Sequence, residues 1–264
     1  MFGYSRQAYY KSQKKKELIE ENDLLEYLFN RRRVPPFEGL RKLYSYTIRE
    51  TELKVSRHHL QQILQENELI INKKRPFRVL TDSSRSKHIH ENYLRKRTPH
   101  HIFEVLVSDI TYLRTRHREY YLTAIMDLYA RMILSYTLTE SLGAEGLIRA
   151  FMLITREYKE RLKGCIFHSD RGSQFCSTEF KLLADRYGLV LSNSRKGNPY
   201  DNACIERLFA TLKNEYMLKV TFSDETTLFR AVKEAVYNYN NIRLHMSLNY
   251  RTPKEYFLAD LKSY

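Results

Sequence analysis

Hydrophobic residues in the first part of the chain recur at the spacing of helices, and helix-breaking residues separate them. One apolar stripe predicts a helix over residues 17–30 and is formed by Leu18, Leu24, Leu25 and Leu28. The prolines of VPPF at 34–37 end this helix, because proline has no backbone N–H to donate. A second helical stripe follows Gly39, and Ser56 is a suitable N-cap for a third helix, RHHLQQILQEN.

The second and third of these predicted helices are short and joined by a turn, which is the arrangement of a helix-turn-helix. In this interpretation residues 1–75 form an all-α DNA-binding region. Four polar side chains point outward from its last helix, namely Arg57, His58, Gln61 and Gln62. An ordinary helical hairpin has the same pattern, so both interpretations stay open. Residues 76–100 are polar and basic without clean periodicity, which predicts a linker.

Short runs of β-branched and apolar residues become frequent after residue 101. Three consecutive runs, at 103–113, 120–130 and 131–139, predict three strands. The segments that follow predict a helix at 144–162, a strand at 165–170, a helix after Ser177, a strand at 189–194 and a helix at 203–218. Strands and helices over residues 101–218 therefore follow in the order β-β-β-α-β-α-β-α.

This order joins an antiparallel meander to alternating strands and helices, which predicts an α/β fold. It is the order of a ribonuclease H-like domain. A helical C-terminal extension is predicted over residues 219–264. Ser223 or Asp224 caps its first helix, and Thr252, Pro253 and Glu255 have the spacing of a capping box with proline at the first helical position.

Charge indicates the class of partner. The 264 residues include 45 Lys+Arg and 31 Asp+Glu, a formal net charge of +14, and most of the excess lies in residues 1–100. Such a basic region attracts nucleic acid, the commonest polyanion, although a solvated surface that aids solubility is the simpler alternative. No apolar run is long enough to cross a bilayer, and the first residues do not form a secretory signal. We therefore expect no membrane partner. The 3 cysteines lack CxxC spacing, so we expect a protein of a reducing compartment.

Three acidic residues occupy informative places in the strand-rich part. Asp109 lies inside an apolar strand, where an unpaired charge is costly. Asp170 ends another strand, at the side of an α/β sheet where ligands bind, and Glu206 lies in the first turns of the last core helix. Converging carboxylates suit Mg²⁺ or Mn²⁺ rather than zinc, and two such ions can hold the attacking and leaving oxygens of a phosphodiester. For any one of these acids alone, a surface or salt-bridged role is the commoner explanation.

The acids lie in distinctive strings: SDITYL at Asp109, HSDRGSQF at Asp170 and NPYDNACIERLFATLKNEY at Glu206, with 35 residues between the last two acids. These strings resemble the DDE integrase core of bacterial insertion-sequence transposases, and most closely the second-reading-frame product of elements with retroviral-integrase-like cores. The tail YNNIRLHMSLNYRTPKEYF resembles the terminal motif of these proteins, and PFEGLRKL with VSRHHLQQILQENELI resembles their helix-turn-helix. The resemblance covers nearly the whole chain.

The resemblance implies a DDE-type transposase, a polynucleotidyl transferase that cleaves DNA at insertion-sequence ends and transfers the strand to target DNA. It implies that Asp109, Asp170 and Glu206 are catalytic and hold two Mg²⁺ or Mn²⁺ ions. The implied partners are double-stranded DNA, as terminal inverted repeats and target, further copies of the chain in a homo-oligomer, and the upstream-frame protein of the same element. A cytoplasmic, nucleoid-associated bacterial protein is expected. The family often has Trp shortly before the first Asp, whereas this chain has Leu106 near that place.

Residues near the acids are candidates for DNA contacts. Lys213 lies two turns after Glu206 on the same helix face, where a phosphate contact and a solvated lysine are equally compatible with the pattern. Arg171 follows Asp170 directly, and Asn202 lies in the loop before the helix of Glu206. His168 shares a strand face with Asp170, and a packed strand histidine is the favoured interpretation.

Two other functions remain alternatives. One is a catalytically inactive DNA-binding regulator derived from a transposase. The other is a ribonuclease H-like nuclease that cuts without a specific end sequence and without strand transfer. The fold alone does not separate these functions, because one fold supports several chemistries.

Overall fold

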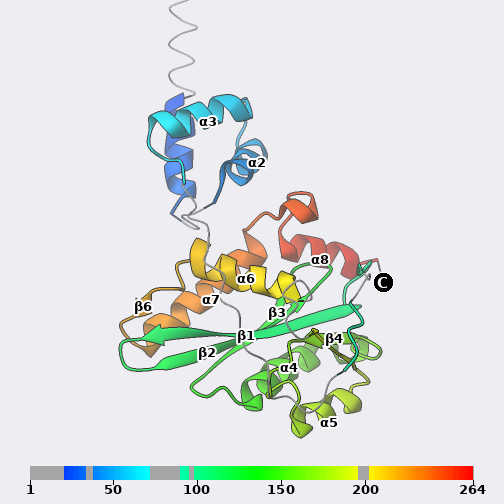
Figure 1. Ribbon diagram of the computed structural model, residues 1–264. Coiled ribbons are helices and arrows are strands. Elements are labelled where there is room, and N and C mark those ends of the chain that lie inside the picture. The colour runs from blue at the N-terminus through cyan, green and yellow to red at the C-terminus, as the bar shows by residue number, and fades with distance from the viewer. Residues whose placement is uncertain (1–20, 34–37, 72–89, 95–97, 196–201, 264) are drawn as a thin grey trace, which may run out of the picture. The chain divides into compact units, whose positions relative to one another are not determined.

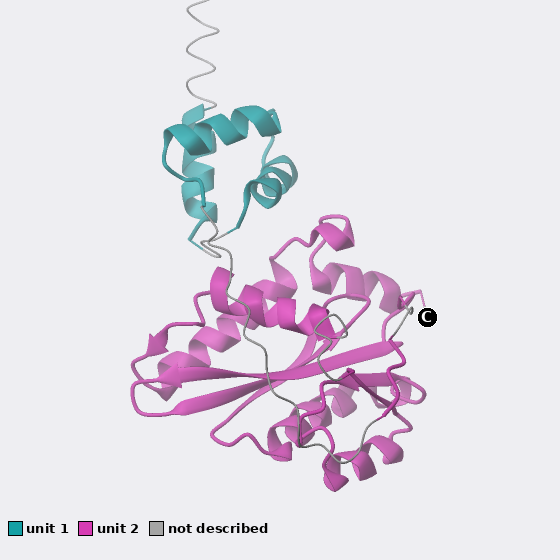
Figure 2. Cartoon of the chain, in the orientation of Figure 1, with its two compact units in different colours: residues 1–75 teal, residues 76–264 magenta. Residues whose placement is uncertain are grey.

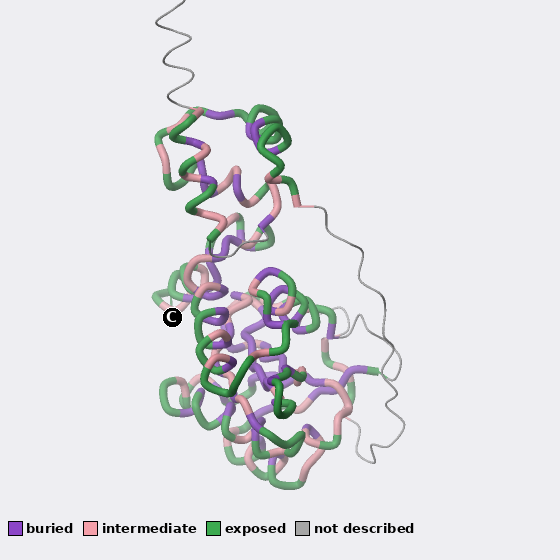
Figure 3. The backbone as a smooth tube through the Cα atoms, turned by 90° about the vertical axis from the view of Figure 1, so that its left-hand side faces the viewer, coloured by how far each residue is buried: buried purple, intermediate pink, exposed green. Residues whose placement is uncertain are grey.

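The computed structural model describes residues 21–33, 38–71, 90–94, 98–195 and 202–263. The chain divides into two compact units, residues 1–75 and residues 76–264, and each is described by itself (Figure 2). Buried residues run through the middle of each unit (Figure 3). No helix in the described part of the chain is long and apolar enough to cross a membrane.

The first unit packs three described helices around one apolar cluster. They are residues 21–31, α2 (Leu40–Glu50) and α3 (Arg57–Glu66). The cluster consists of Leu24, Leu28, Leu43, Val55, Leu60, Ile63 and Leu64. Ser56 caps α3 as predicted, because its side chain accepts a hydrogen bond from the backbone N–H of His59 at 3.1 Å. Leu18, at the start of the first predicted helix, lies outside the described residues.

The second unit is built on a mixed sheet with the strand order β3-β2-β1-β4-β5 (Figure 1). The first three strands form an antiparallel meander, and β4 and β5 run parallel to β1. Their bounds are β1 Val105–Thr115, β2 Glu119–Asp127, β3 Ile133–Thr139, β4 Ile166–Ser169 and β5 Val190–Asn193. Each of the five predicted strands is present. A sixth strand, β6 (Thr221–Phe222), pairs with the end of β1 and was not predicted, because two residues are too few to show an alternation.

Helices cover both faces of this sheet (Figure 1). One face packs against α4 (Ala144–Tyr158) and α5 (Thr178–Arg186), and the other against α6 (Ala203–Glu215) and α7 (Glu225–Asn241). Side chains of β1 alternate between the two apolar layers: Val105 and Val107 pack beneath α6 and α7, whereas Leu106 packs beneath α4 and α5. A short 3₁₀ turn, η1 (Lys159–Arg161), follows α4.

The predicted C-terminal extension contributes to the core of the second unit. Helix α7, capped by Asp224, adds Leu228 and Val232 to the apolar layer it covers. A 3₁₀ turn, η3 (Met246–Leu248), leads to α8 (Pro253–Leu261), and both halves of its predicted capping box are present. Phe257 of α8 packs against Phe103 with ring centroids 5.6 Å apart. The two apolar layers are therefore complete only with residues from this segment.

Part of the region predicted as a linker is attached to β5. The backbone N–H of His90 donates to Oδ1 of Asn193, and that of Tyr93 donates to Oγ of Ser192, both at 3.0 Å. Leu94 packs against the apolar layer beneath α6 and α7. Local periodicity does not reveal such bonds, because their partners are 103 and 99 positions further along the chain. The rest of this region that lies outside the described residues is 76–89 and 95–97.

Candidate active site

Asp109 and Asp170 stand at the same level of two neighbouring parallel strands. The last pair in the register of β1 and β4 is Ser108 with Ser169. Each acid is the next residue along its own chain segment. Because neighbouring strands lie about 4.8 Å apart, backbone pairing keeps the two acids close together.

Alternation along β1 turns Asp109 towards α6. Val105 and Val107 pack beneath α6 and α7, and Asp109 is the next residue at this spacing. Helix α6 carries Glu206 in its first turn and Lys213 in its last turn. A separation of seven residues is about two helical turns, so both side chains lie on one face of α6. Asp109, Asp170 and Glu206 are called the acidic site below.

The acids of this site influence one another's ionisation. Burial and then the negative charges of Asp170 and Glu206 raise the pKa of Asp109 to about 7, while the backbone N–H of Ile110 and the charge of Lys213 oppose the shift. Burial raises the pKa of Asp170. Burial and then the charge of Asp170 raise the pKa of Glu206. Three acids from distant parts of the sequence therefore share one electrostatic environment.

Hydrogen bonds to the side chain and to the backbone of Asp170 fix its position. Its Oδ1 accepts a hydrogen bond from the N–H of Gly172 at 2.8 Å, and its carbonyl accepts one from Nδ2 of Asn193 at 3.0 Å. Next to it, Nε of Arg171 donates to the carbonyl of Ser194 at 2.8 Å. The segment after β4 is thus tied to the end of β5, and the strands hold Asp170 in place.

The donor set fits a divalent cation, although the side chains do not form a finished metal site. Within the described ranges, no group of three or more His, Cys, Asp or Glu side chains is placed to hold a metal ion as it stands. Carboxylate oxygens are nevertheless the ligands that Mg²⁺ and Mn²⁺ prefer. Burial and the two neighbouring acids disfavour the ionised form of Asp109, and a divalent cation bound there would favour it. Glu206 is exposed, so its side chain can change rotamer without disturbing the core.

Lys213 lies beside the acidic site. Its pKa is lowered by burial and then by the charge of Arg114, whereas Asp109 raises it. Its Nζ lies 4.5 Å from the centre of the Tyr112 ring. Lys213 is therefore half-buried among charged and aromatic groups, which does not match a lysine on a solvated face.

Two other residues near the acids are buried. Asn202 is 6% exposed at the N-cap of α6, so most of its side chain is covered here, and its contact with DNA stays a prediction. Its Oδ1 has no hydrogen-bond partner in the described part of the chain. The ring nitrogens of His168 lie 2.8 Å from Oγ of Ser192 and 3.1 Å from Oγ of Ser194. This packing agrees with the favoured interpretation of His168 as a strand histidine.

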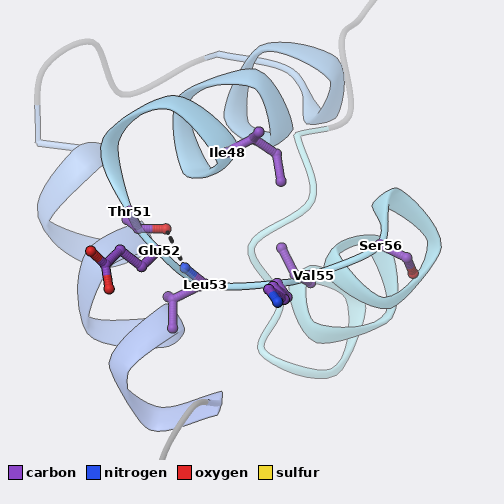
Figure 4. A pocket seen from close by; sticks show the side chains of 7 residues that line it. Ile48, Thr51, Glu52, Leu53, Val55 and Ser56 are labelled. Atoms are coloured by element: carbon purple, nitrogen blue, oxygen red, sulfur yellow. Dashed lines mark hydrogen bonds between the residues drawn. The ribbon is translucent and has the colours of Figure 1, made fainter.

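The predicted recognition residues occupy the exposed side of α3 in the first unit. Arg57, His58, Gln61 and Gln62 are exposed, whereas Leu60, Ile63 and Leu64 of the same helix pack inward. Beside the start of α3 is an open hollow of about 530 Å³ that is lined by Ile48 and residues 51–56 (Figure 4). In its wall the hydroxyl of Thr51 accepts a hydrogen bond from the backbone N–H of Leu53 at 3.3 Å. The hollow marks the turn between α2 and α3.

Sequence reasoning assigned no role to three residues that lie near the acids. Tyr112 and Arg114 of β1 lie close to Lys213, and Asn193 binds the backbone of Asp170. A signal for Asn193 was available, because it ends a parallel strand on the ligand-binding side of the sheet. No such signal existed for Tyr112, whose exposure depends on where the neighbouring strands stop.

The family matches concern the second unit. Residues 99–199 match one integrase core domain family and residues 187–253 match a second family of the same description. Over 259 residues the chain is 31% identical to the insertion element IS600 uncharacterized 31 kDa protein of Shigella sonnei, which covers 96% of this chain and 94% of that protein. It is 30% identical over 154 residues to the transposase for insertion sequence element IS904 of Lactococcus lactis, which covers 58% of this chain and 60% of that protein.

A solved structure extends the likeness to the fold. The simian T-cell lymphotropic virus intasome, in complex with PP2A regulatory subunit B56 gamma, contains a chain that matches with a TM-score of 0.50 and 18% identity. The match covers 83% of this chain and 70% of that chain. The predicted ribonuclease H-like α/β fold is therefore confirmed, and with the integrase core it defines a polynucleotidyl transferase. The chain belongs to the bacterial insertion-sequence transposases, and the predicted function in DNA transposition is confirmed at this level.

Proposed function

We propose that this transposase cleaves DNA at the ends of its insertion sequence and joins the freed strand to target DNA at the acidic site. The observation that carries the proposal is the register of β1 with β4, which sets Asp109 beside Asp170, and the negative charges of Asp170 and Glu206 act together on Asp109. These acids come from β1, the end of β4 and the start of α6. Carboxylates of one sign that lie close together repel one another unless a cation joins them.

The three acids would hold two Mg²⁺ or Mn²⁺ ions. When bound, such ions act as Lewis acids that stabilise the attacking and leaving oxygens of an in-line displacement. Asp109 and Asp170 bind from paired strands and therefore keep a fixed separation, whereas Glu206 closes the set from α6. Water in the first step and a 3′-hydroxyl in the second attack phosphodiesters at this one place. The ammonium of Lys213 contacts a phosphate next to the scissile bond.

Double-stranded DNA is the substrate, as terminal inverted repeats and as target. The net charge of +14 and the exposure of Arg57, His58, Gln61 and Gln62 on α3 support this, and these side chains would read the repeats in a major groove. Arg171 adds a contact beside Asp170. Two ends must be joined to one target, so the chain acts as a homo-oligomer, together with the upstream-frame protein of its element. The nucleoid of the bacterial cytoplasm is where this substrate lies.

Substitution of each acid tests the proposal. Asp109→Asn, Asp170→Asn and Glu206→Gln preserve shape and remove one negative charge each. In assays with Mg²⁺ or Mn²⁺ on a duplex of the element's terminal repeat, we expect cleavage and strand transfer to fall below detection while DNA binding persists. Asp185→Asn is the matched control, because Asp185 is an exposed acid of α5 in the same unit.

Each contrary result has a definite meaning. Full activity of any acid variant contradicts the assignment of the acidic site. DNA binding by the unaltered protein without metal-dependent cleavage supports the regulator alternative. Cleavage without preference for the terminal repeat and without strand transfer supports the nuclease alternative.

A further inference from the structure

Tyr112 is an exposed aromatic residue beside the acidic site. It follows Asp109 by three positions on β1, and its side chain is 52% exposed. Two cations lie near its ring: Nζ of Lys213 at 4.5 Å and Cζ of Arg114 at 5.2 Å from the ring centre. An exposed ring with two cations close to it combines the two features by which proteins bind the bases and phosphates of a single strand.

The sheet leaves an open edge at this place. Strand β4 ends at Ser169, opposite Ser108, and β6 begins at Thr221, opposite Arg114. Between these two pairs, residues 109–113 of β1 have no neighbouring strand on that side within the described part of the chain. A strand of another polymer that follows this open edge can therefore reach both residues, although alternation points Asp109 and Tyr112 to opposite faces of the sheet.

The charges of this cluster favour an anionic ligand. Arg114 and Lys213 repel each other, and this repulsion adds to burial in lowering the pKa of Lys213. Glu119 bonds to Arg114 at 2.8 Å, but both side chains are exposed, and such pairs contribute little. Phosphates on both sides of a base supply two negative charges at the spacing of neighbouring nucleotides.

We propose that Tyr112 is a stacking platform for an unpaired base of the DNA strand that enters the acidic site, with Lys213 and Arg114 contacting the phosphates beside that base. Three strand residues span about 10 Å, so the base belongs to the few nucleotides next to the scissile phosphate. This inference rests on the proposed function and deepens it. It requires the end duplex to open there, because a paired base does not offer its face to a side chain.

A simpler role for Tyr112 is to position Lys213 through the contact of the ammonium with the ring. That role predicts the same loss for paired and unpaired DNA when the ring is removed. Stacking predicts a larger loss for unpaired DNA. The two roles therefore separate in one comparison.

Binding to two forms of one DNA makes that comparison. The probes are the terminal-repeat duplex, fully paired, and the same duplex with three mismatched pairs at the cleavage end. Affinities are measured in the full chain carrying Glu206→Gln, so that cleavage does not intervene. We expect Tyr112→Ala to weaken binding of the mismatched probe by about fivefold or more, and by a smaller factor for the paired probe. Tyr112→Phe retains the ring and should bind both probes within about twofold of the parent.

Tyr237→Ala is the matched control, because Tyr237 is a 59% exposed tyrosine on α7 in the same unit. It should leave both affinities unchanged. Equal losses on the two probes in Tyr112→Ala overturn the stacking proposal. So does a Tyr112→Phe variant that binds as weakly as Tyr112→Ala, and this comparison remains informative if the alanine variant folds poorly.

A covalent readout identifies the contact directly. With 5-iodouracil at the mismatched positions, ultraviolet light should crosslink the DNA to the peptide that contains Tyr112, and the crosslink should vanish in Tyr112→Ala. Crosslinks only to other peptides overturn the inference. This result is independent of the proposed function, which fails instead when the unaltered protein does not cleave the terminal repeat with Mg²⁺.

Discussion

The guanidinium of Arg243 holds the carboxylate of Glu215 with two hydrogen bonds, 2.9 Å from Nε and 3.1 Å from Nη2. Both side chains are buried, and Nη1 of Arg243 lies 2.9 Å from Nε2 of His245. Glu215 is the last residue of α6, the helix of Glu206 and Lys213. The RLH string of the tail therefore fixes the end of the helix that completes the acidic site.

Breaking this pair should destabilise the fold. Arg243→Met removes the guanidinium and leaves a buried carboxylate, which costs about 3–5 kcal/mol of unfolding free energy. The double variant with Glu215→Leu should recover most of the loss, because no buried charge remains. Urea unfolding measures both. Arg118→Ala, which breaks the exposed pair with Glu140, should cost at most about 1 kcal/mol. An Arg243→Met variant as stable as the parent would contradict this prediction.

Lys213→Ala should weaken DNA binding, because it removes a positive charge that contacts a phosphate. Loss of one phosphate contact lowers affinity for all sequences alike and reduces the slope of log affinity against log salt by about 1. Fluorescence anisotropy over a series of salt concentrations measures that slope. Lys233→Ala, on the exposed side of α7, is the control and should leave the slope unchanged. An unchanged slope in Lys213→Ala would favour a lysine that does not touch DNA.

Variants of α3 should lose sequence preference. Arg57→Ala or Gln61→Ala removes a side chain that can contact base edges, and such contacts are worth about 1–3 kcal/mol of discrimination. Competition between terminal-repeat DNA and random DNA measures the preference. Glu26→Gln, on the first helix of the same unit, should leave it unchanged. Equal weakening on both DNAs would support the helical hairpin interpretation instead of a helix-turn-helix that reads sequence.

Deprotonation of Asp127 should lower the free energy of unfolding as the pH rises through the acid range. It is buried at the end of β2, where it accepts backbone N–H bonds from Phe103 and Ala130 at 2.8 Å. Burial raises its pKa from 3.8 to about 6. Between these values the folded chain binds more protons than the unfolded chain, so the unfolding free energy decreases with pH, by about 3 kcal/mol in total, and with respect to this group it levels off about one unit above the pKa of about 6.

Asp127→Asn removes this titration and isolates it from that of other groups. Unfolding free energies of parent and variant, measured by urea at intervals from pH 4 to pH 7, give the difference directly. The stability of the parent relative to the variant should decline through about pH 6 and level off about one unit above it. A difference that is constant over the whole range would show that Asp127 does not titrate in this window.

Local patterns were sufficient for the five longer strands and the main helices, and for the elements on which the acids lie. The apolar alternation of β1 identified Asp109 as a charge inside a strand, and the caps at Ser56 and Thr252 follow from neighbouring residues. The register of β1 with β4, which sets Asp109 beside Asp170, is non-local. The sequence indicated it only through the resemblance to a family.

Features that depend on distant contacts could not be predicted. The exposure of Tyr112 follows from where β4 ends and β6 begins, and neither boundary is marked near Tyr112 in the sequence. The polar segment at 90–94 has the sequence of a linker, and only its hydrogen bonds to Asn193 and Ser192 show that it is attached to β5. Asn202 is a polar residue in a polar loop of the sequence, which predicts exposure, yet it is buried at the N-cap of α6.

The contribution of α7, α8 and Arg243 to the second unit has a consequence for synthesis on the ribosome. Strands β1 to β5 and α6 emerge before α7, so the part of the apolar layer that α7 covers is still open. The C-terminal end of α6 is anchored only after Arg243 has left the exit tunnel. A fragment that stops after α6 would therefore expose apolar surface and be prone to aggregate.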